Sequence, residues 1–390
     1  MKPIVVALIG GGYAGFLHVN GYKRVHGVPV RIKTIVDIDL EKAKSFAATY
    51  GIEGAAASVD EVLNDPEIDI IDIVTPPVTH IDIATKALRS GKHVICEKPL
   101  SGYFGEEEDE LPIGLRVPKA KMFKKVMEQI DEFKSIVEES SRLFMYAENY
   151  IYCPSVTKSA EIITNKKSKL LFMKGEESLR GSSSPLAGRW DKTGGGSFIR
   201  VGTHPLTGIL YLKQVEAKAR GEEISVVSVS ADMGNTGASL TEYDKRHLTL
   251  NPIDVEDFAN VTLTFSDGTK AIVIGADNVL GGTKNYIEIY ANDASMICNI
   301  TPANNLSTYF LDQDNLDDVT ISEMLPEKTG WNNAFVCDEI LRGYTFEMQD
   351  FIESVAYNRE PLSGIEMAYE TTKILYAAYM AAEEKRTVSL

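Results

Sequence analysis

The stretch ALIGGGYAGFLH, from Ala7 to His18, decides the fold class of this chain of 390 residues. It holds three glycines with GxGxxG spacing, after a run of apolar strand-forming residues and at the start of a helical pattern. Such glycines allow a tight turn and close approach of a pyrophosphate to the backbone, and the helix N-terminus attracts the anion. The stretch therefore predicts a dinucleotide site at the end of the first strand. We expect cofactor contacts from Gly10, Gly12, Tyr13, Ala14 and Gly15.

Asp37 ends the second predicted strand, 22 residues after Gly15. A carboxylate about 20 residues beyond the glycine turn accepts hydrogen bonds from the ribose hydroxyls of NAD. Ile38 and Asp39 follow without an arginine beside them, so a 2′-phosphate would meet negative charge. The sequence therefore favours NAD over NADP as the cofactor. In the alternative reading, the glycines only form a turn.

Residues 1–150 alternate short apolar runs with amphipathic helical patterns, which is typical of βαβ units with a parallel sheet. A helix is expected after Asp39 with its end at Gly51, and capping-box spacing at Ser58 and at Thr79 predicts two more helix starts. An acidic insertion at about 101–121 is expected to be a solvated loop. We predict a Rossmann NAD-binding domain with strands at 4–9, 30–36, 68–74, 93–96 and 142–150.

Residues 151–390 have a different pattern, and we predict an α+β domain for substrate binding and oligomerisation. Its long β-rich runs are separated by turns at Ser266–Gly268 and Asn292–Asp293, which favours a mostly antiparallel open sheet. The region 301–343 is expected to be irregular. Two closing helices are predicted on either side of a Pro-Leu-Ser-Gly turn, and they can pack back on the first domain.

Composition and charge exclude several classes of protein. The net charge is -16 and the pI is near 5.0, which disfavours nucleic acid and anionic membranes as partners. No targeting or membrane-spanning segment is found, and a cytoplasmic protein is expected. The six histidines form no cluster of metal ligands, so no metal is predicted. The four cysteines lack CxxC spacing and predict neither disulfides nor a zinc site: Cys96, Cys153, Cys298 and Cys337.

Two more segments lie at predicted strand exits, where α/β proteins bind ligands. In "HVICEKPL", a lysine stands between Glu97 and Pro99 directly after a buried strand. In "TPPVTH", Thr75 and the two prolines end a strand and turn the chain across the face where a nicotinamide would lie. His80 either contacts the cofactor or packs within its helix.

Taken together, these motifs resemble the glucose-fructose oxidoreductase, inositol dehydrogenase and MocA (Gfo/Idh/MocA) family of oxidoreductases. The resemblance continues in "WDKTGGGSFIRVGTHPLTGILYL", which looks like the family's GGG segment followed by glycine-x-histidine on a helix. "VEDFANVTLTFSDGTKA" and "PLSGIEMAYE" look like its sheet and C-terminal helix signatures. The likeness covers nearly the whole chain, except the insertion and the region after Thr301.

The resemblance implies a site in the cleft between two domains, with Lys98 beside the nicotinamide and His204 opposite it as acid/base. Histidine titrates near neutral pH and can exchange the proton of an alcohol, and an ammonium stabilises alkoxide charge. The alternatives are a surface lysine and a packed histidine. The resemblance also implies homodimers or homotetramers. It implies further cofactor contacts from Thr75, Pro76, His80, Glu97 and Lys98.

The match to the family is incomplete near the histidine. The family commonly has aspartates four residues before and three residues after it, where this chain has Arg200 and Thr207. An arginine would lower the pKa of His204 rather than support its protonated form. We predict that Arg200 binds a substrate carboxylate or hydroxyl groups. Alternatively, Arg200 pairs with an acidic neighbour such as Glu148.

Other candidate substrate contacts flank these motifs. If "AENYIYCP" is a strand, alternation places Glu148, Tyr150 and Tyr152 on one face, where the tyrosines line a sugar pocket or pack in the core. The segment 178–196 is expected to be a loop over the cleft. Its polar and stacking groups are Arg180, Arg189 and Trp190.

We therefore expect an NAD-dependent oxidoreductase that transfers a hydride between nicotinamide and a ring hydroxyl or ketone. The expected substrate is a sugar, sugar acid, cyclitol or glycoside. One alternative is a redox-neutral NAD-dependent glycosidase or lyase that acts through a transient keto-sugar. A second alternative is a non-catalytic NAD-binding regulator.

Overall fold

The computed structural model describes residues 2–301, 306–317, 319, 321, 327–334, 336 and 338–390. Contacts group the chain into two compact units. Unit 1 comprises Met1–Gly102, Lys124–Tyr152 and Gly343–Thr372. Unit 2 comprises Tyr103–Phe123, Cys153–Arg342 and Lys373–Leu390. The predicted boundary near residue 150 stays a prediction, and Cys337 lies outside the described residues.

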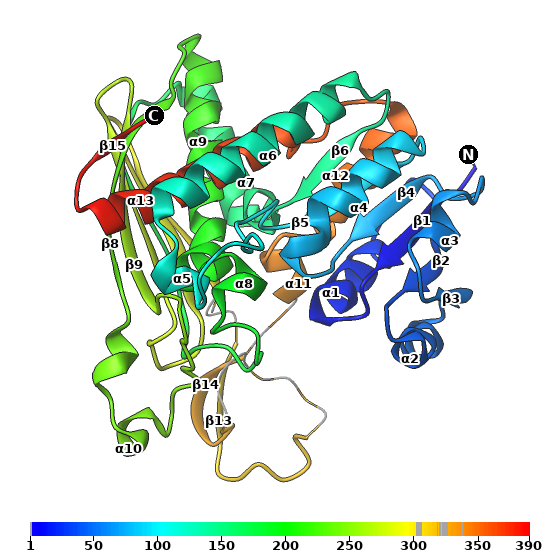
Figure 1. Cartoon of the computed structure of the whole chain (residues 1–390), viewed down its shortest axis with the longest axis horizontal. Coiled ribbons are helices and arrows are strands. Elements are labelled where there is room, and N and C mark those ends of the chain that lie inside the picture. Colours follow the sequence, from blue (N-terminus) through cyan, green and yellow to red (C-terminus); the bar gives the residue numbers. More distant parts are fainter. Residues whose placement is uncertain are drawn as a thin grey trace. The chain divides into compact units, whose positions relative to one another are not determined.

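Unit 1 is built on a six-stranded parallel sheet, as predicted. Its strand order, β3-β2-β1-β4-β5-β6, is the doubly wound order in which a dinucleotide binds where the order reverses. The strands are β1 (Ile4–Ile9), β2 (Val30–Val36), β3 (Gly54–Ala56), β4 (Ile70–Ile73), β5 (His93–Glu97) and β6 (Phe144–Ala147). The helices are α1 (Tyr13–Tyr22), α2 (Leu40–Tyr50), α3 (Asp60–Leu63), α4 (His80–Arg89), α6 (Lys119–Glu139) and α12 (Tyr344–Tyr357), with 3₁₀ turns η1 (Pro77–Thr79) and η2 (Asn149–Tyr152) (Figure 1).

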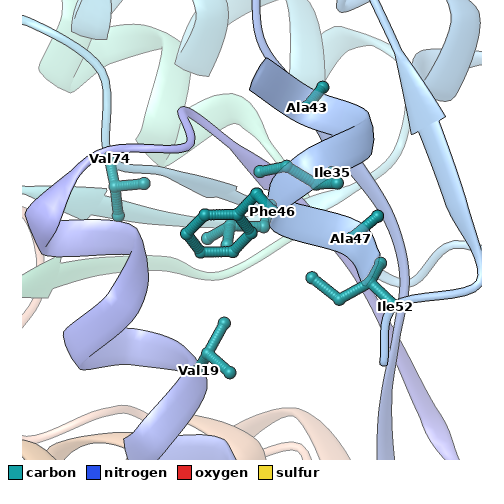
Figure 2. Packing of buried hydrophobic residues seen from close by; sticks show 8 residues of the cluster. Val19, Ile35, Ala43, Phe46, Ala47, Ile52 and Val74 are labelled. Atoms are coloured by element: carbon teal, nitrogen blue, oxygen red, sulfur yellow. The ribbon is translucent and has the colours of Figure 1, made fainter. Parts of the chain in front are cut away.

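Helix α2 shows how local signals and packing act together. Asp39 accepts hydrogen bonds from the amides of Glu41 and Lys42, and Gly51 ends the helix with a φ of 72°. Both ends are therefore as predicted. Figure 2 shows the ring of Phe46 among apolar side chains of α1, β2 and the β4 exit. Truncating such a buried ring to alanine costs about 3–5 kcal/mol.

The predicted helix start at Thr79 is confirmed, but the predicted capping by its side chain is not. The Thr79 side chain does not cap α4; its hydroxyl lies 2.7 Å from the Thr75 hydroxyl and donates to the Pro76 carbonyl. The helix begins at His80, directly after the 3₁₀ turn that the prolines favour. At the other predicted start, Glu61 accepts from the Ser58 amide as expected.

The segment AENYIYCP is not a strand. Strand β6 ends at Ala147 and the 3₁₀ turn η2 follows it. Glu148, Tyr150 and Tyr152 are all buried, together with the residues between them, so the expected alternation of faces is absent. Short apolar runs do not separate strand from turn by periodicity. Because residues 148–152 are buried on all sides, their apolar run was mistaken for a strand.

Unit 2 is built on a seven-stranded sheet in the order β12-β11-β7-β10-β9-β8-β15. Its neighbours are antiparallel except for β7 and β10, so the mostly antiparallel prediction is confirmed. The strands are β7 (Leu170–Ser178), β8 (Val226–Gly234), β9 (Phe258–Phe265), β10 (Lys270–Ala276), β11 (Lys284–Ala291), β12 (Ser295–Thr301) and β15 (Val388–Ser389).

Helices pack on this sheet, and α9 lies along β7. The helical elements are α5 (Ile113–Arg116), α7 (Pro154–Lys166), α8 (Trp190–Thr193), the π-helix η3 (Phe198–Gly202), α9 (Thr203–Arg220), η4 (Thr236–Ser239), α10 (Glu242–Lys245), α11 (Asp338–Leu341) and α13 (Ile365–Glu384) (Figure 1). The region expected to be irregular also contains two paired strands, β13 (Ser307–Phe310) and β14 (Gly330–Asn333). None of the described helices is long and apolar enough to cross a membrane.

The insertion at 101–121 is a solvated loop only in its acidic part, where Glu107, Glu108 and Glu110 are exposed and no helix or strand forms. It contains α5, and Ile113 is buried. The Gly114 amide donates to the Asp254 carboxylate at 2.9 Å, and the Lys119 ammonium donates back to the Gly114 carbonyl. A Cβ on Gly114 would lie 1.9 Å from the Asp254 carbonyl oxygen, so this contact requires glycine.

Candidate functional site

The glycines of the turn between β1 and α1 differ in whether the fold itself requires them. Gly10 has a φ of 114°, and a Cβ there would lie 2.8 Å from the Val74 carbonyl oxygen. A Cβ on Gly15 would lie 2.6 Å from the Gly10 carbonyl oxygen. At Gly12, by contrast, a Cβ would meet no atom of the described chain within 4 Å. That space suits the close approach of a pyrophosphate.

The first turn of α1 carries no acidic residue, and the described structure shows no side-chain cap on it. A helix N-terminus of this kind favours an anion. Tyr13 begins the helix and is 61% exposed. The turn fits the phosphate groups of a dinucleotide.

Asp37 lies beside this turn. Its carboxylate accepts hydrogen bonds from the Gly11 amide at 3.0 Å, from the Lys42 ammonium at 2.8 Å and from the Asp39 amide at 3.1 Å. Burial alone would raise the pKa of Asp37, but these donors, led by Lys42, hold the pKa below its ordinary value. The carboxylate stays ionised as an acceptor for ribose hydroxyls. The sequence analysis did not predict the role of Lys42. Its place in the first turn of α2, five residues after Asp37, could have indicated it.

His80 is buried and its ring faces two backbone carbonyls. Nε2 lies 2.8 Å from the Thr75 oxygen and Nδ1 lies 2.9 Å from the Pro99 oxygen. This arrangement agrees with the packed alternative, because both ring nitrogens face the protein. Thr75 is half-buried and Pro76 is exposed at the β4 exit.

The EKP segment follows β5, the neighbour of β4. Glu97 ends the strand, and its Oε2 accepts a hydrogen bond from the Lys98 amide at 2.9 Å. Lys98 is half-buried and forms a cis peptide bond with Pro99. Because the carboxyl ends of parallel strands meet at one edge, Lys98 shares its sheet edge with the glycine turn.

Two other predicted residues follow β6, next to this strand. Glu148 and Tyr150 are both buried, and Glu148 Oε1 accepts a hydrogen bond from the Tyr150 amide. Their proposed contact with a substrate stays a prediction.

A buried charged cluster beneath Glu97 was missed from the sequence. His18 Nδ1 lies 2.9 Å from an oxygen of Asp72, and His18 Nε2 lies 3.3 Å from Glu97 Oε1. The Tyr22 hydroxyl donates to Asp72 at 2.8 Å. Burial would lower the pKa of His18, but Asp72 and Glu97 raise the pKa well above its usual value. Nothing in the sequence marked Asp72, which lies inside a strand.

In unit 2, Arg200 lies within the π-helix η3, and the helix α9 that follows carries the buried His204. Arg200 Nη2 lies 2.5 and 2.6 Å from the two carboxylate oxygens of Asp277. Arg200 therefore has an acidic partner, Asp277. Burial raises the pKa of Asp277, although Arg200 opposes this shift. Asp277 directly follows the last residue of β10, and this place at a strand end was the one feature of the sequence that could have pointed to it.

Glu256 holds the GGG segment that leads to Arg200. Its carboxylate accepts hydrogen bonds from the amides of Gly196 and Phe198 and from the Tyr379 hydroxyl, each at 2.9 Å. A Cβ on Gly196 would lie 2.0 Å from the Glu256 carbonyl oxygen. Burial raises the pKa of Glu256 to about 7, although these donors lower it. The crowded backbone explains the glycines before η3.

The three loop residues expected over the cleft differ in environment. Trp190 is 2% exposed and packs edge-on against Tyr379, so its ring lies in the core. Arg189 pairs with Asp191 at 2.8 Å, and the Arg180 carbonyl accepts from the Thr249 amide. The loop serines instead line a polar pocket of about 20 Å³ in unit 2. Its polar lining includes Ser182, Ser184, Thr249, Asn251, Asp257 and Asp277.

No group of side chains among the described residues is arranged to hold a metal ion. The geometry fits a nicotinamide dinucleotide through the open space at Gly12 and the ionised Asp37.

Comparison with known proteins agrees with this geometry. The family model "Oxidoreductase family, NAD-binding Rossmann fold" matches residues 4–109, and "GFO/IDH/MocA C-terminal domain" matches residues 174–297. Levoglucosan dehydrogenase of Pseudarthrobacter phenanthrenivorans is 28% identical over 326 residues, which cover 80% of this chain and 77% of that protein. Inositol 2-dehydrogenase of Arthrobacter sp. is 42% identical over 103 residues, 26% of this chain and 29% of that protein.

Solved structures share the fold over the whole chain. GenD2 from gentamicin A biosynthesis, in complex with NAD, has a TM-score of 0.78 at 19% identity and covers 100% of this chain and 97% of its own. Levoglucosan dehydrogenase with NADH and levoglucosan has a TM-score of 0.74 at 20% identity, covering 100% and 99%. The chain therefore belongs to the Gfo/Idh/MocA family of oxidoreductases, with its NAD-binding Rossmann domain and its C-terminal domain.

Proposed function

We propose that this protein is an NAD-dependent dehydrogenase that interconverts a ring hydroxyl and a ketone of a sugar, sugar acid, cyclitol or glycoside. One observation carries the proposal: a glycine turn with open space at Gly12 and a lysine, Lys98, follow strands of the same parallel sheet at the same edge. A phosphate cradle and a primary amine at one edge suit a cofactor and a carbinol that react together.

Bound NAD supplies the acceptor for the hydride that leaves the carbinol carbon. The ammonium of Lys98 binds the substrate oxygen and stabilises its negative charge as the proton leaves. The imidazole of His204 accepts that hydroxyl proton, and the same residues work in reverse for the reduction. Hydride and proton together account for the two hydrogens that an alcohol loses on becoming a ketone.

The polar groups of unit 2 support a polyhydroxylated substrate. Arg200 and Asp277 offer charged donors and acceptors side by side. Adjacent hydroxyls of a sugar or cyclitol need such paired donors and acceptors. The names of the relatives, a levoglucosan dehydrogenase and an inositol 2-dehydrogenase, support the same class. We propose Arg200, Glu148, Tyr150 and the segment around Trp190 as substrate-side residues.

The proposal is tested by incubating the protein with NAD and a panel of levoglucosan, myo-inositol, glucose and gluconate, while the absorbance of reduced nicotinamide is followed. Lys98→Met and His204→Asn should each lower kcat by about 10²–10⁴-fold, the range for lost acid–base and charge stabilisation. Lys124→Met and His247→Asn change exposed residues and serve as matched controls.

Full activity of Lys98→Met would contradict the proposal. Substrate consumption without accumulation of NADH would indicate the redox-neutral glycosidase or lyase, and NAD binding without turnover of any compound would indicate the regulator. The homodimer or homotetramer implied by the resemblance stays a prediction, which sedimentation of the purified protein checks. The cytoplasmic location also stays a prediction.

A further inference from the structure

The backbone on both sides of Lys98 is held by buried histidines. Before it, the Lys98 amide donates to Glu97 Oε2 at 2.9 Å, and the other oxygen of Glu97 lies 3.3 Å from His18 Nε2. After it, the Pro99 carbonyl oxygen lies 2.9 Å from His80 Nδ1. Both histidines are 0% exposed.

We propose that His18 and His80 are positioning residues for Lys98, His18 acting through Glu97 and His80 acting through Pro99. The inference rests on the proposed function, in which the amine of Lys98 meets the substrate oxygen. Neither histidine touches the reacting atoms in this proposal. Each fixes one side of the backbone from which the amine extends.

We call the contacts by which each histidine restrains the Lys98 backbone an arm. The His18 arm depends on two carboxylates, one on each side of the imidazole ring. Asp72 faces Nδ1 and Glu97 faces Nε2, so both contacts are hydrogen bonds only when the ring carries two N–H groups. Asp72 is held in turn by the Tyr22 hydroxyl. Glu347 of α12 is buried near this cluster, and burial raises the pKa of its carboxyl well above the usual value. The cationic ring therefore links two strands, β4 through Asp72 and β5 through Glu97.

The His80 arm joins the exits of the same two strands. The ring bridges the carbonyl of Thr75, after β4, and the carbonyl of Pro99, after β5. Burial lowers the pKa of His80, although both carbonyls oppose this shift. A neutral ring donates to one carbonyl at a time and still fills the space between the two loops.

Such support has a large effect on rate because misplacing a reacting group by about 1 Å costs about 10²-fold in turnover. The lysine side chain is long and flexible, so its backbone must be fixed before its amine can be. Two arms from different secondary elements restrain that backbone from both directions.

Two variants of His18 test the first arm. The amide nitrogen of asparagine lies near the place of Nδ1 and that of glutamine near the place of Nε2. His18→Asn therefore keeps the contact with Asp72 and loses the contact with Glu97, while His18→Gln does the reverse. His26→Asn changes an exposed histidine of the same unit and is the matched control. For the second arm, His80→Gln keeps a donor and His80→Leu removes it.

The first measurement is hydrogen exchange of the Lys98 amide by mass spectrometry, with NAD present, which needs no substrate. The second is kcat and KM with levoglucosan or myo-inositol. We expect faster exchange and an approximately 10- to 100-fold lower kcat in His18→Asn and His80→Leu, with KM for NAD within about twofold of the wild type. His18→Gln, His80→Gln and His26→Asn should stay closer to the wild type in both measurements.

Unchanged exchange at Lys98 in both His18→Asn and His80→Leu would overturn the inference, as would equal losses of kcat in His18→Asn and His18→Gln. If His18→Asn does not fold, Glu97→Gln tests the same arm, because it keeps an acceptor for the Lys98 amide and loses the charged contact with His18. Failure of the proposed function is distinguishable: Lys98→Met would then keep its activity, while the exchange of the Lys98 amide would still report on the two arms.

Discussion

Arg200 and Asp277 form an ion pair in unit 2, with Nη2 of the arginine 2.5 and 2.6 Å from the two carboxylate oxygens. Arg200 occupies the place, four residues before His204, where this family commonly has an aspartate. In this chain a carboxylate reaches Arg200 from the end of β10 instead. In this chain the two charged groups therefore come from different elements, the guanidinium from η3 and the carboxylate from the residue after β10.

The pair should be strongly coupled because its side chains are only 17% and 12% exposed. Arg200→Ala leaves a nearly buried carboxylate without its cation and should cost about 3 kcal/mol of unfolding free energy. In a double-mutant cycle with Asp277→Asn, measured by urea unfolding, the coupling should be about 0.5–3 kcal/mol. The more exposed pair of Arg189 and Asp191 is the control, with an expected coupling of about 0–1 kcal/mol. Additive losses of unfolding free energy at Arg200 and Asp277 would contradict the coupling. Separately, an unchanged KM for the substrate in Arg200→Ala would contradict the proposed role of Arg200 in substrate binding.

Gly12 and Gly15 should respond differently to the same substitution. Gly12→Ala adds a Cβ that meets no atom of the described chain within 4 Å, so the melting temperature should not change. NAD affinity should fall about tenfold or more, because the methyl group occupies the space that a pyrophosphate approaches. Gly15→Ala places a Cβ 2.6 Å from the Gly10 carbonyl and should destabilise the fold by about 1–3 kcal/mol. Thermal melting with fluorescence titration of NADH distinguishes the two, and wild-type affinity in Gly12→Ala would contradict the assignment of the turn.

Asp37 should determine the preference for NAD over NADP. Asp37→Ser removes the carboxylate that accepts ribose hydroxyls and leaves Lys42 without its partner, so the ratio of kcat/KM for NAD to that for NADP should fall about tenfold or more. Asp39→Asn keeps the cap of α2, which Asp39 provides through the amides of Glu41 and Lys42, and should keep the ratio. Kinetics with both cofactors measure the effect. Equal ratios in Asp37→Ser and the wild type would rule out this role.

Glu256 should make the protein less stable as the pH rises from 4.5 to about 7. Its pKa in the folded protein is about 7, against 4.5 as the ordinary value, so between these values the folded state binds more protons than the unfolded state. The free energy of unfolding then falls with rising pH, by about 3 kcal/mol in total for this group. Glu256→Gln removes the titration and should flatten the profile. Urea unfolding across this range checks the difference, and parallel profiles for the two proteins would contradict it.

Local signals in the sequence determined the type of sheet in each half and the place of the cofactor turn. The GxGxxG spacing, Asp37 and the ends of α2 depend on backbone conformation and on neighbours within a few residues, which a sequence displays directly. The periodicity of apolar residues likewise indicated a parallel sheet followed by a mostly antiparallel one. Where periodicity was short, as in AENYIYCP, burial by other parts of the chain produced a pattern that misled.

Only the tertiary structure decided which charged groups meet. Asp277 lies 77 residues from Arg200 in the sequence, and Asp72 lies 54 residues from His18. No local spacing marks such pairs, because they form when separate strands and helices pack. The same packing placed Trp190 in the core and joined Thr75 to Pro99 through His80. The sequence therefore predicted which residues carry the chemistry, while the packing of distant elements decided which partners contact them.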